Sequence, residues 1–246
     1  MTTRAGGVSS GPYASMNVGA AVGDDPGRVA ANRARLAAAT AAAPVFLRQV
    51  HGTRVVRVGA DDAAAGAAVQ EADAAVTTAA GVACVVQAAD CLPVLLAAPD
   101  GLAVGAAHAG WRGLAGGVIE AAVDAVSRAA GCAPAELSAW LGACIGADAF
   151  EVGADVLAAF GLDPDAAASG SAAPHRFRAQ GGRKWLADLA GLARDRLAAA
   201  GVARVDGGRW CTVAERDRFF SYRRDGTTGR MAAAIWIECA GVHTRG

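Results

Sequence analysis

The sequence predicts an α+β fold with mixed β-sheets, and three observations carry this prediction. Residues 82–108 are apolar but interrupted by polar residues and by Pro93, which indicates several buried strands in succession. Residues 113–130 show the periodicity of an amphipathic helix. Helical and strand segments then follow one another without clean βαβ alternation, which favours mixed sheets over a doubly wound parallel sheet.

Length and composition set further bounds. A chain of 246 residues fits one domain covering 1–246, because no stretch has the composition of a linker. Its 54% hydrophobic residues never form the ~20 uninterrupted positions of a membrane-spanning helix. Formal net charge is zero, with 23 basic and 23 acidic residues, so neither nucleic acid nor an anionic membrane is expected as a partner.

The N-terminal residues and the cysteines indicate the cellular compartment. Residues 1–4 (Met-Thr-Thr-Arg) open no apolar segment of the kind found in secretory signal peptides, so we expect a cytoplasmic protein. The six cysteines are scattered without paired spacing. This favours free thiols or a metal ligand over a disulfide framework.

In the first half of the chain, turn residues at 6–13 precede one helix and a series of strands. A carboxylate N-cap in the pair Asp24-Asp25, followed by Pro26, predicts a helix that runs to about Thr40. Alternation and β-branched residues then predict six strands. These strands cover 45–50, 53–58, 74–78, 82–87, 93–97 and 102–107.

The second half begins with the clearest helix, over 113–130, whose apolar residues share one face. A strand at 137–141 follows, then helices at 154–160 and 184–200. Residues 163–182 are rich in Ala, Gly, Ser and Pro and predict a surface loop. The chain closes with a strand at 231–238.

Three residues form the constellation that points to chemistry. Of the four histidines (51, 108, 175 and 243), His51 and His108 stand beside glycine at the ends of predicted strands. Cys91, next to Asp90, interrupts an apolar strand run. Two imidazoles and one thiolate leave a fourth tetrahedral position open, as in catalytic zinc sites. The alternative is that these are ordinary core residues.

Two further segments favour anions. His108 leads through Gly110, Trp111 and Arg112 into the predicted helix, where free N–H groups and the guanidinium favour a phosphate; an ordinary tight turn is the alternative. Residues 219–230 contain three arginines among turn residues, which suits phosphate or carboxylate recognition. A solvated turn with Arg–Asp pairs is the alternative there. The three are Arg223, Arg224 and Arg230.

Several motifs, in order along nearly the whole chain, resemble one family. They are Thr3-Arg4, Gly6–Ser9, Gly11–Asn17, Val22–Pro26, Gln49-Val50-His51-Gly52, Ala89-Asp90-Cys91, His108–Gly113, Cys211-Thr212 and Ser221–Gly226. The sequence resembles the laccase-domain family, long labelled polyphenol oxidase and associated with purine nucleoside phosphorylase activity. The most specific motifs are Ala-Asp-Cys and His-Ala-Gly-Trp-Arg-Gly.

The resemblance implies a layered α/β/β/α fold with two mixed sheets and a zinc site at His51, Cys91 and His108. It also implies phosphorolysis of adenosine, inosine and 5′-methylthioadenosine to base and ribose 1-phosphate, with some adenosine deamination. Partners would be purine nucleosides and phosphate, and the protein would be a monomer or homodimer. Within the matching motifs, Arg4 and Asn17 become candidates for substrate binding beside Arg112 and the C-terminal arginines.

The catalytic assignments at this point are His108, Cys91 and Asp90, with Asp90 orienting ribose or acting as acid/base group. A multicopper oxidase is disfavoured because four histidines cannot supply its copper centres, although Cu²⁺ could bind in vitro. A thiolate–imidazole amidohydrolase acting in cell-wall precursor editing is an alternative, with Cys91 as nucleophile. A metal-dependent binding or scaffold protein is the alternative outside enzymes.

Overall fold

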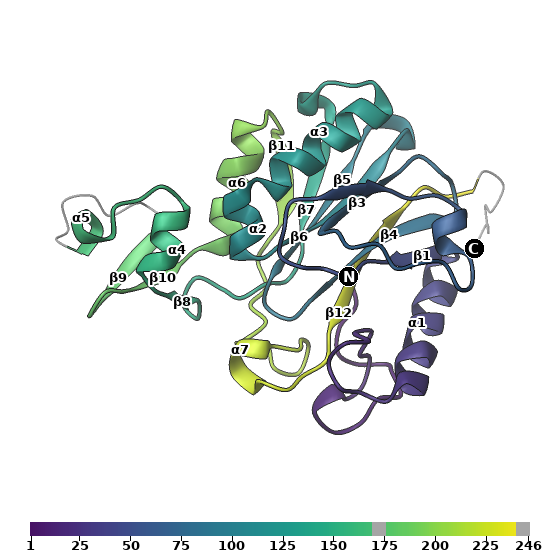
Figure 1. Ribbon diagram of the computed structural model, residues 1–246, viewed down its shortest axis with the longest axis horizontal. Helices are drawn as coiled ribbons and strands as arrows, with labels where there is room; N and C mark the ends of the chain where they lie inside the picture. Colours follow the sequence, from purple (N-terminus) through teal and green to yellow (C-terminus); the bar gives the residue numbers. More distant parts are fainter. Residues whose placement is uncertain (169–175, 240–246) are drawn as a thin grey trace.

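Two mixed β-sheets lie face to face at the centre of the molecule, with helices on both outer faces (Figure 1). The computed structural model describes residues 1–168 and 176–239. The order of layers is α/β/β/α, as the family resemblance implied. No helix in these ranges is long and apolar enough to cross a membrane.

The larger sheet has six strands in the order β11-β7-β5-β6-β3-β2. Its outer pairs β11–β7 and β2–β3 are parallel, whereas the inner pairs are antiparallel. The strands are β2 (Val55–Arg57), β3 (Ala74–Thr77), β5 (Leu92–Ala97), β6 (Val104–Ala109), β7 (Ser138–Leu141) and β11 (Arg204–Gly207).

The smaller central sheet has the order β1-β4-β12, with β1 parallel and β12 antiparallel to β4. It consists of β1 (Ala43–Phe46), β4 (Val82–Ala88) and β12 (Met231–Trp236). A third, antiparallel sheet projects from one end of the molecule in Figure 1. It is built from β8 (Glu151–Val152), β10 (Lys184–Ala187) and β9 (Phe177–Gly181).

Helices cover the outer faces of both central sheets. The helix α1 lies against the smaller sheet, while α2, α3 and α6 lie against the larger one. The projecting sheet carries α4 and α5, and α7 precedes β12. Their bounds are α1 (Pro26–Thr40), α2 (Trp111–Gly116), α3 (Val118–Ala130), α4 (Ala154–Ala159), α5 (Pro164–Ala168), α6 (Leu189–Ala199) and α7 (Tyr222–Asp225).

The strand β5 shows why this region reads as a continuous apolar run. Val94 and Leu96 pack against α3, whereas Leu95 faces the smaller sheet. All three are buried. Because both faces of the strand are covered, alternation between apolar and polar residues is lost, as the sequence predicted.

The helix over 26–40 is confirmed, with the Asp25 carboxylate accepting from the Arg28 N–H at 2.9 Å. The predicted continuous helix over 113–130 is wrong. It is broken at Gly117, whose φ of +100° ends α2 and begins α3. Glycine adopts this left-handed conformation without steric cost.

Two C-terminal assignments also need correction. Residues 184–187 are a strand, because they pair with β8 and β9, and the helix starts only after Asp188 caps it through the Gly191 N–H. Part of the predicted loop 163–182 forms α5 and β9, while 169–175 lie outside the described residues. The strand β11, which pairs with β7, was not predicted.

Buried amides fasten the N-terminal segment onto α1. Asn32, fully buried, donates from Nδ2 to Ser9 Oγ and to the carbonyls of Ser15 and Asn17, and its Oδ1 accepts from the Val8 N–H. The Asn17 carboxamide in turn accepts from the N–H of Arg230 at 2.8 Å. Asn32 therefore holds the N-terminal segment against α1, and Asn17 of that segment binds the chain near its C-terminal end.

We expect Asn32→Ala to lower the free energy of unfolding by about 2–4 kcal/mol, because several buried polar groups lose their partners at once. Urea denaturation followed by circular dichroism measures the change. The exposed Ala34→Gln on the same helix serves as control and should stay within about 0.5 kcal/mol of the parent. Equal stability of both variants would contradict the anchoring role of Asn32.

Candidate metal centre and its pocket

The structure brings His51, Cys91 and His108 together, with one donor atom of each within 4.8 Å of the others. Cys91 directly precedes β5, and His108 lies in β6 opposite Pro93 of β5. His51 comes from the loop after β1, and its Nε2 lies 3.7 Å from Cys91 Sγ. Antiparallel pairing of β5 and β6 thus sets the positions of two of the three donors. His175 and His243 lie outside the described residues.

Asp73 orients both histidines. Its carboxylate is fully buried and accepts hydrogen bonds from the N–H groups of Val50, His51 and Gly52, at 3.1, 2.9 and 2.7 Å. Asp73 Oδ1 also lies 2.8 Å from His108 Nδ1. A carboxylate on Nδ1 leaves Nε2 as the ligand atom and fixes the ring plane, as in many metal sites.

Two glycines of the His108–Gly113 motif provide clearance. A Cβ on Gly110 would lie 2.7 Å from His51 Cδ2 and 3.0 Å from Cys91 Sγ. A Cβ on Gly113 would lie 2.8 Å from the Gly52 carbonyl oxygen. Because neither residue has a side chain, the backbone at the start of α2 can lie directly against His51, Cys91 and Gly52. This explains why glycine stands at both positions.

Two residues at this site have a strained backbone. His51 has φ of +62° and Asp90 has φ of +101°, both in the region that favours glycine. Left-handed non-glycine residues cost about 1–3 kcal/mol each and are retained where the surroundings hold them. At His51 the three N–H groups bonded to Asp73 hold the turn. At Asp90 the carboxylate accepts from Thr212 Oγ1 at 2.5 Å and from the Arg223 N–H at 2.6 Å.

The thiol and the imidazoles influence each other's protonation. Burial by itself raises the pKa of Cys91, but His108 and His51 outweigh it and bring the pKa to about 6. Burial by itself lowers the pKa of His108, whereas the Cys91 thiolate and the Asp73 carboxylate raise this pKa to about 9. The cluster therefore favours a thiolate, which is the form that binds metal or acts as a nucleophile.

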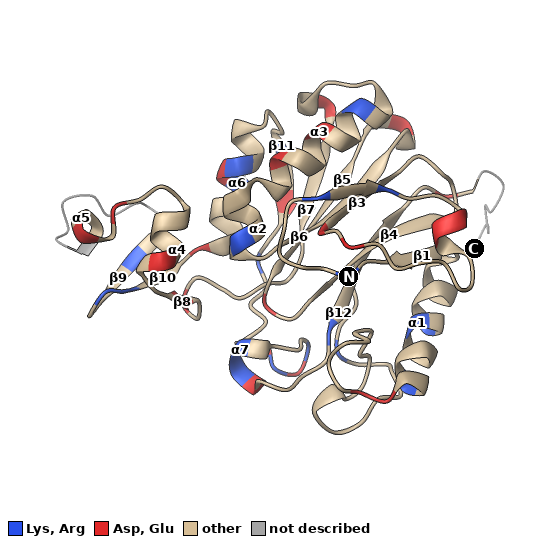
Figure 2. Cartoon of the chain, viewed as in Figure 1, with Lys and Arg blue, Asp and Glu red and all other residues tan. Residues whose placement is uncertain are grey.

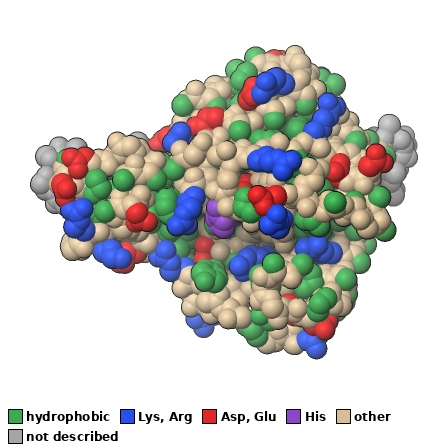
Figure 3. Space-filling view, viewed as in Figure 1, with side chains coloured by type: hydrophobic (Ala, Val, Ile, Leu, Met, Phe, Trp, Pro, Cys, Tyr) green, Lys and Arg blue, Asp and Glu red, His purple; other side chains and the backbone are tan. Residues whose placement is uncertain are grey.

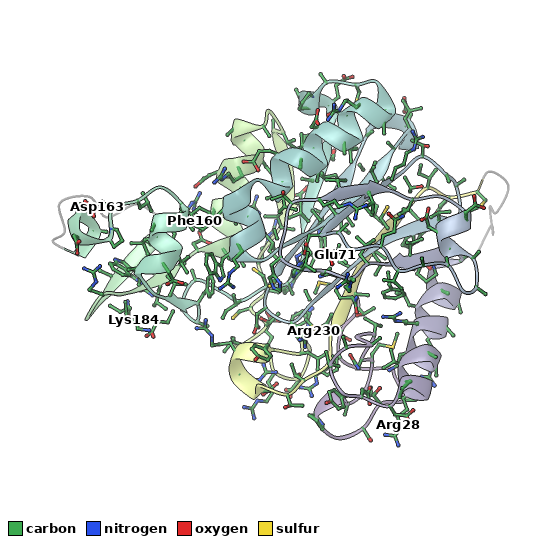
Figure 4. The ribbon with its side chains drawn as sticks, in the orientation of Figure 1. Arg28, Glu71, Phe160, Asp163, Lys184 and Arg230 are labelled. Carbon is green, nitrogen blue, oxygen red and sulfur yellow. The ribbon has the colours of Figure 1, made fainter. Side chains whose placement is uncertain are left out.

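A pocket of about 660 Å³ opens beside the cluster. Figure 3 shows a histidine side chain in a hollow on this face, with basic side chains nearby. Arg33, Arg48 and Arg230 line the pocket, and none of its described lining residues is Asp or Glu. Figure 4 places Arg230 near the middle of the same face. The remaining lining residues are Gly19, Ala20, Ala21, Val22, Phe46, Leu47, Gln49, His51, Val69, Gln87, Ala88, Ala89, Cys91, His108 and Tyr222.

Comparison with known proteins gives the family. The family model described as multi-copper polyphenol oxidoreductase laccase matches residues 1–238. The chain belongs to this family. Escherichia coli (strain K12) has a relative named purine nucleoside phosphorylase YfiH, 47% identical over 238 residues, 96% of this chain and 92% of that protein. A Pseudomonas aeruginosa relative named purine nucleoside phosphorylase PA4543 is 46% identical over 241 residues, 97% of this chain and 92% of its own length.

Solved structures of the family share the fold. Neisseria meningitidis protein NMB0706 superimposes with a TM-score of 0.86 at 48% identity, covering 97% of this chain and 93% of that one. YlmD from Geobacillus stearothermophilus also gives a TM-score of 0.86, at 36% identity, with 97% and 90% covered. The layered fold expected from the family resemblance is confirmed.

Of the predicted phosphate-binding or substrate-binding residues, Arg230 lines the pocket, with Nη1 donating to the carbonyls of Thr228 and Gly229. Asn17 does not, because its buried amide bonds Gly19, Asp24 and Arg230. Arg4 donates to the carbonyls of Ala14 and Arg216, away from the cluster. These bonds hold Asn17 and Arg4 within the protein, and contact of either residue with substrate stays a prediction.

The other arginines are also held elsewhere. Arg224 donates to the carbonyls of Thr212, Val213 and Phe219 and pairs with Asp225, and Figure 2 shows the adjacent basic and acidic residues on α7. Arg223 donates from Nη1 to the Glu151 carbonyl at 3.0 Å. Arg112 stacks on Trp111 at the start of α2, a helix of only six residues, and is not among the described pocket-lining residues.

Sequence reasoning missed Asp73, Arg33 and Gln87. A signal for Asp73 existed, since a carboxylate directly before an apolar strand must find a partner when buried. Arg33 and Gln87 carry no local signal: one lies on a helix and the other near the end of a strand, and only the packing of α1 on β4 turns both toward the pocket.

As a candidate metal centre, the cluster should depend on Asp73. We expect Asp73→Asn to weaken zinc affinity by about 10–100-fold, because the amide NH₂ would face N–H donors of the 50–52 turn. Competition with a chromophoric chelator measures this. Glu71→Gln removes an exposed carboxylate two residues away and should leave zinc affinity unchanged. Parent-like affinity in Asp73→Asn would show that this carboxylate does not organise the ligands.

Clearance at Gly110 gives a second test. Gly110→Ala should weaken zinc binding by roughly tenfold or more, since a methyl group would displace His51 or Cys91. Gly59→Ala is the matched control, because a Cβ there meets no atom within 4 Å. Isothermal titration of both variants with zinc compares them. A Gly110→Ala protein that binds as tightly as Gly59→Ala would contradict this account.

Proposed function

We propose that this chain is a metal-dependent purine nucleoside phosphorylase that converts adenosine, inosine and 5′-methylthioadenosine to free base and ribose 1-phosphate. The observation that carries the proposal is one pocket, of a size that suits a small ligand, into which both the His51–Cys91–His108 cluster and Arg230 open. The names of the relatives support the same activity. We further propose that residues 1–246 act as one catalytic domain.

The donor set fits a zinc ion. Two imidazoles and a thiolate are typical of catalytic zinc sites with one open position. Cys91 favours the thiolate, and Asp73 holds His108 with Nε2 available. His51, Cys91 and His108 would hold the ion, which would supply Lewis acidity to phosphate or to a substrate oxygen. The same donors also suit Cu²⁺ in vitro, because affinity for copper generally exceeds that for zinc.

In phosphorolysis a phosphate oxygen bonds to C1′ while the bond from C1′ to the base nitrogen breaks. Arg230 is the candidate to bind the phosphate, because its guanidinium is partly buried beside the cluster and is held by two carbonyls. A charge-assisted hydrogen bond from a preorganised guanidinium positions the nucleophile. The leaving base needs a proton. No described pocket residue is a carboxylic acid, so we assign dihydrogen phosphate as the proton donor.

Asp90 takes a different role from the acid/base function expected from the sequence. Its two oxygens accept from Thr212 Oγ1 and from the Arg223 N–H, and it does not line the pocket. We assign it a positioning role: it connects the strained turn before Cys91 to the start of α7. The adjacent Tyr222 of α7 then reaches the pocket.

Adenosine deamination is the secondary activity in this proposal. It needs a group that moves a proton to the departing amine, and the described pocket residues include no carboxylate for this task. Asp73 bonded to His108 Nδ1 is the acidic group in contact with the cluster. We therefore expect deamination to be slower than phosphorolysis. The same Cys91–His108 pair would serve the alternative amidohydrolase, whose thiolate must be free of metal.

Chromatography of zinc-loaded protein with adenosine, with and without phosphate, tests the proposal. We expect adenine that appears only with phosphate, and a smaller amount of inosine in both reactions. His108→Ala should lose zinc and reduce both rates by at least about 100-fold, because one ligand and the Asp73 contact are removed together. Full activity of a zinc-free His108→Ala protein would contradict the metal mechanism. An active metal-free parent with an amide substrate would support the hydrolase instead.

A further inference from the structure

One part of the pocket is lined by residues of α1 and of the smaller sheet, and we call this part the arm. Phe46 of β1, Gln87 of β4 and Arg33 of α1 line it, together with residues 19–22. The Arg33 guanidinium stacks on the Phe46 ring at 3.8 Å, and its Nε donates to the Val18 carbonyl at 2.9 Å. The Phe46 ring and the Arg33 guanidinium therefore give the arm flat walls, which suit the face of an aromatic base.

Two glutamine side chains meet at this arm and have different roles. The Gln49 carboxamide is fully engaged with the backbone of Gln87: Nε2 donates to the Gln87 carbonyl at 2.8 Å, and Oε1 accepts from the Gln87 N–H at 2.7 Å. The Gln49 side chain thus makes the two backbone hydrogen bonds with Gln87 that a neighbouring strand would otherwise make at the end of β4. The Gln87 carboxamide itself has no hydrogen-bond partner within the described part of the chain.

The side of β4 on which Gln87 lies explains where its amide goes. Val85 and Ala83, two and four residues earlier, pack in the core under α1 together with Ala232, the register partner of Gln87. Gln87 continues this face past the region that α1 covers and meets the pocket instead. The Gln87 amide is half-buried and faces the pocket, so a ligand with a complementary polar edge can bond to it in place of water.

We propose that Gln87 contacts the 6-substituent of the purine base, with the base in the arm and the ribose toward the cluster. This inference rests on the proposed phosphorylase function. A carboxamide offers both a donor and an acceptor, and rotation about its last torsion exchanges them. It can accept from the 6-amino group of adenosine or donate to the 6-oxo group of inosine. One residue then accounts for a site that takes both bases.

Two substitutions of Gln87 test the contact, with kcat/KM measured for adenosine, inosine and purine riboside, which carries only hydrogen at position 6. Gln87→Leu removes donor and acceptor at similar size. It should lower kcat/KM for adenosine and inosine by about tenfold and leave purine riboside within about twofold. Gln87→Glu keeps only acceptors, so it should raise the adenosine-to-inosine ratio of kcat/KM by about tenfold or more.

Gln180→Glu adds the same charge on the exposed strand β9 and should leave all ratios unchanged. Zinc content of each variant is measured in parallel, because the contact predicts that it stays at the parent level. Equal losses for all three nucleosides, or unchanged ratios in both Gln87 variants, would overturn the inference. An increase in KM for phosphate alone in Gln87→Glu would also overturn it, because it would place the anion in the arm.

These outcomes are separate from a failure of the proposed function. A parent enzyme that releases no base from any of the three nucleosides in the presence of phosphate would reject the phosphorylase, and the inference with it. A parent enzyme that releases base, combined with base preferences that do not respond to Gln87, would reject the inference alone.

Discussion

The buried carboxylate of Asp73 is the interaction on which the rest of the site depends. It joins the turn that carries His51 to the strand that carries His108, through three backbone N–H groups and one imidazole. Burying a carboxylate is costly unless its hydrogen-bonding capacity is used, and four donors use it fully here. Because these bonds hold Asp73 ionised, its pKa is lowered in spite of burial, which by itself would raise it.

Besides the hydrogen bonds of Asp73, the site depends on glycines whose missing side chains let other groups approach closely. Gly110 brings the start of α2 against His51 and Cys91, and Gly19 leaves room for the Arg230 side chain, 2.8 Å from where a Cβ would stand. Segments near both ends of the chain therefore lie side by side, joined by hydrogen bonds of the Asn17 and Asn32 amides. The donors therefore lie in a closely packed part of the fold that borders the pocket.

The sequence predicted most of the fold because its strong signals are local. The Asp25–Pro26 cap and the continuous apolar strands survive in the structure, and the layered arrangement followed from motifs shared with the family. The errors arose where non-local pairing decides, as at residues 184–187, where a segment with helical composition pairs with β8 and β9. The two histidines stood out because the chain has only four and both lie near glycine, and the resemblance to the family implied the complete ligand set with Cys91.

Most of the candidate arginines bond to protein groups in the structure, and their contact with phosphate stays a prediction. In a sequence, a basic side chain in a turn has the same appearance whether it meets phosphate or a carbonyl. Arg224, with three carbonyl partners and one carboxylate, is a structural cross-link that composition cannot distinguish from a binding residue. Arg33 shows the reverse case: helix periodicity assigns it to a surface, and only the stacking on Phe46 reveals a pocket wall. A residue that joins a site only because two elements pack together has no local signal in the sequence, so it cannot be predicted from the sequence alone.

The three donors come from a loop after β1, the residue before β5 and the interior of β6, so no single hairpin contains them all. A partly folded chain thus offers no complete site, and the free energy of binding an ion at these donors would be coupled to folding of the whole core. Each tenfold excess of free ion above its dissociation constant then adds about 1.4 kcal/mol to the native state. For this protein, metal supply in the cell would act as a determinant of abundance as well as of turnover.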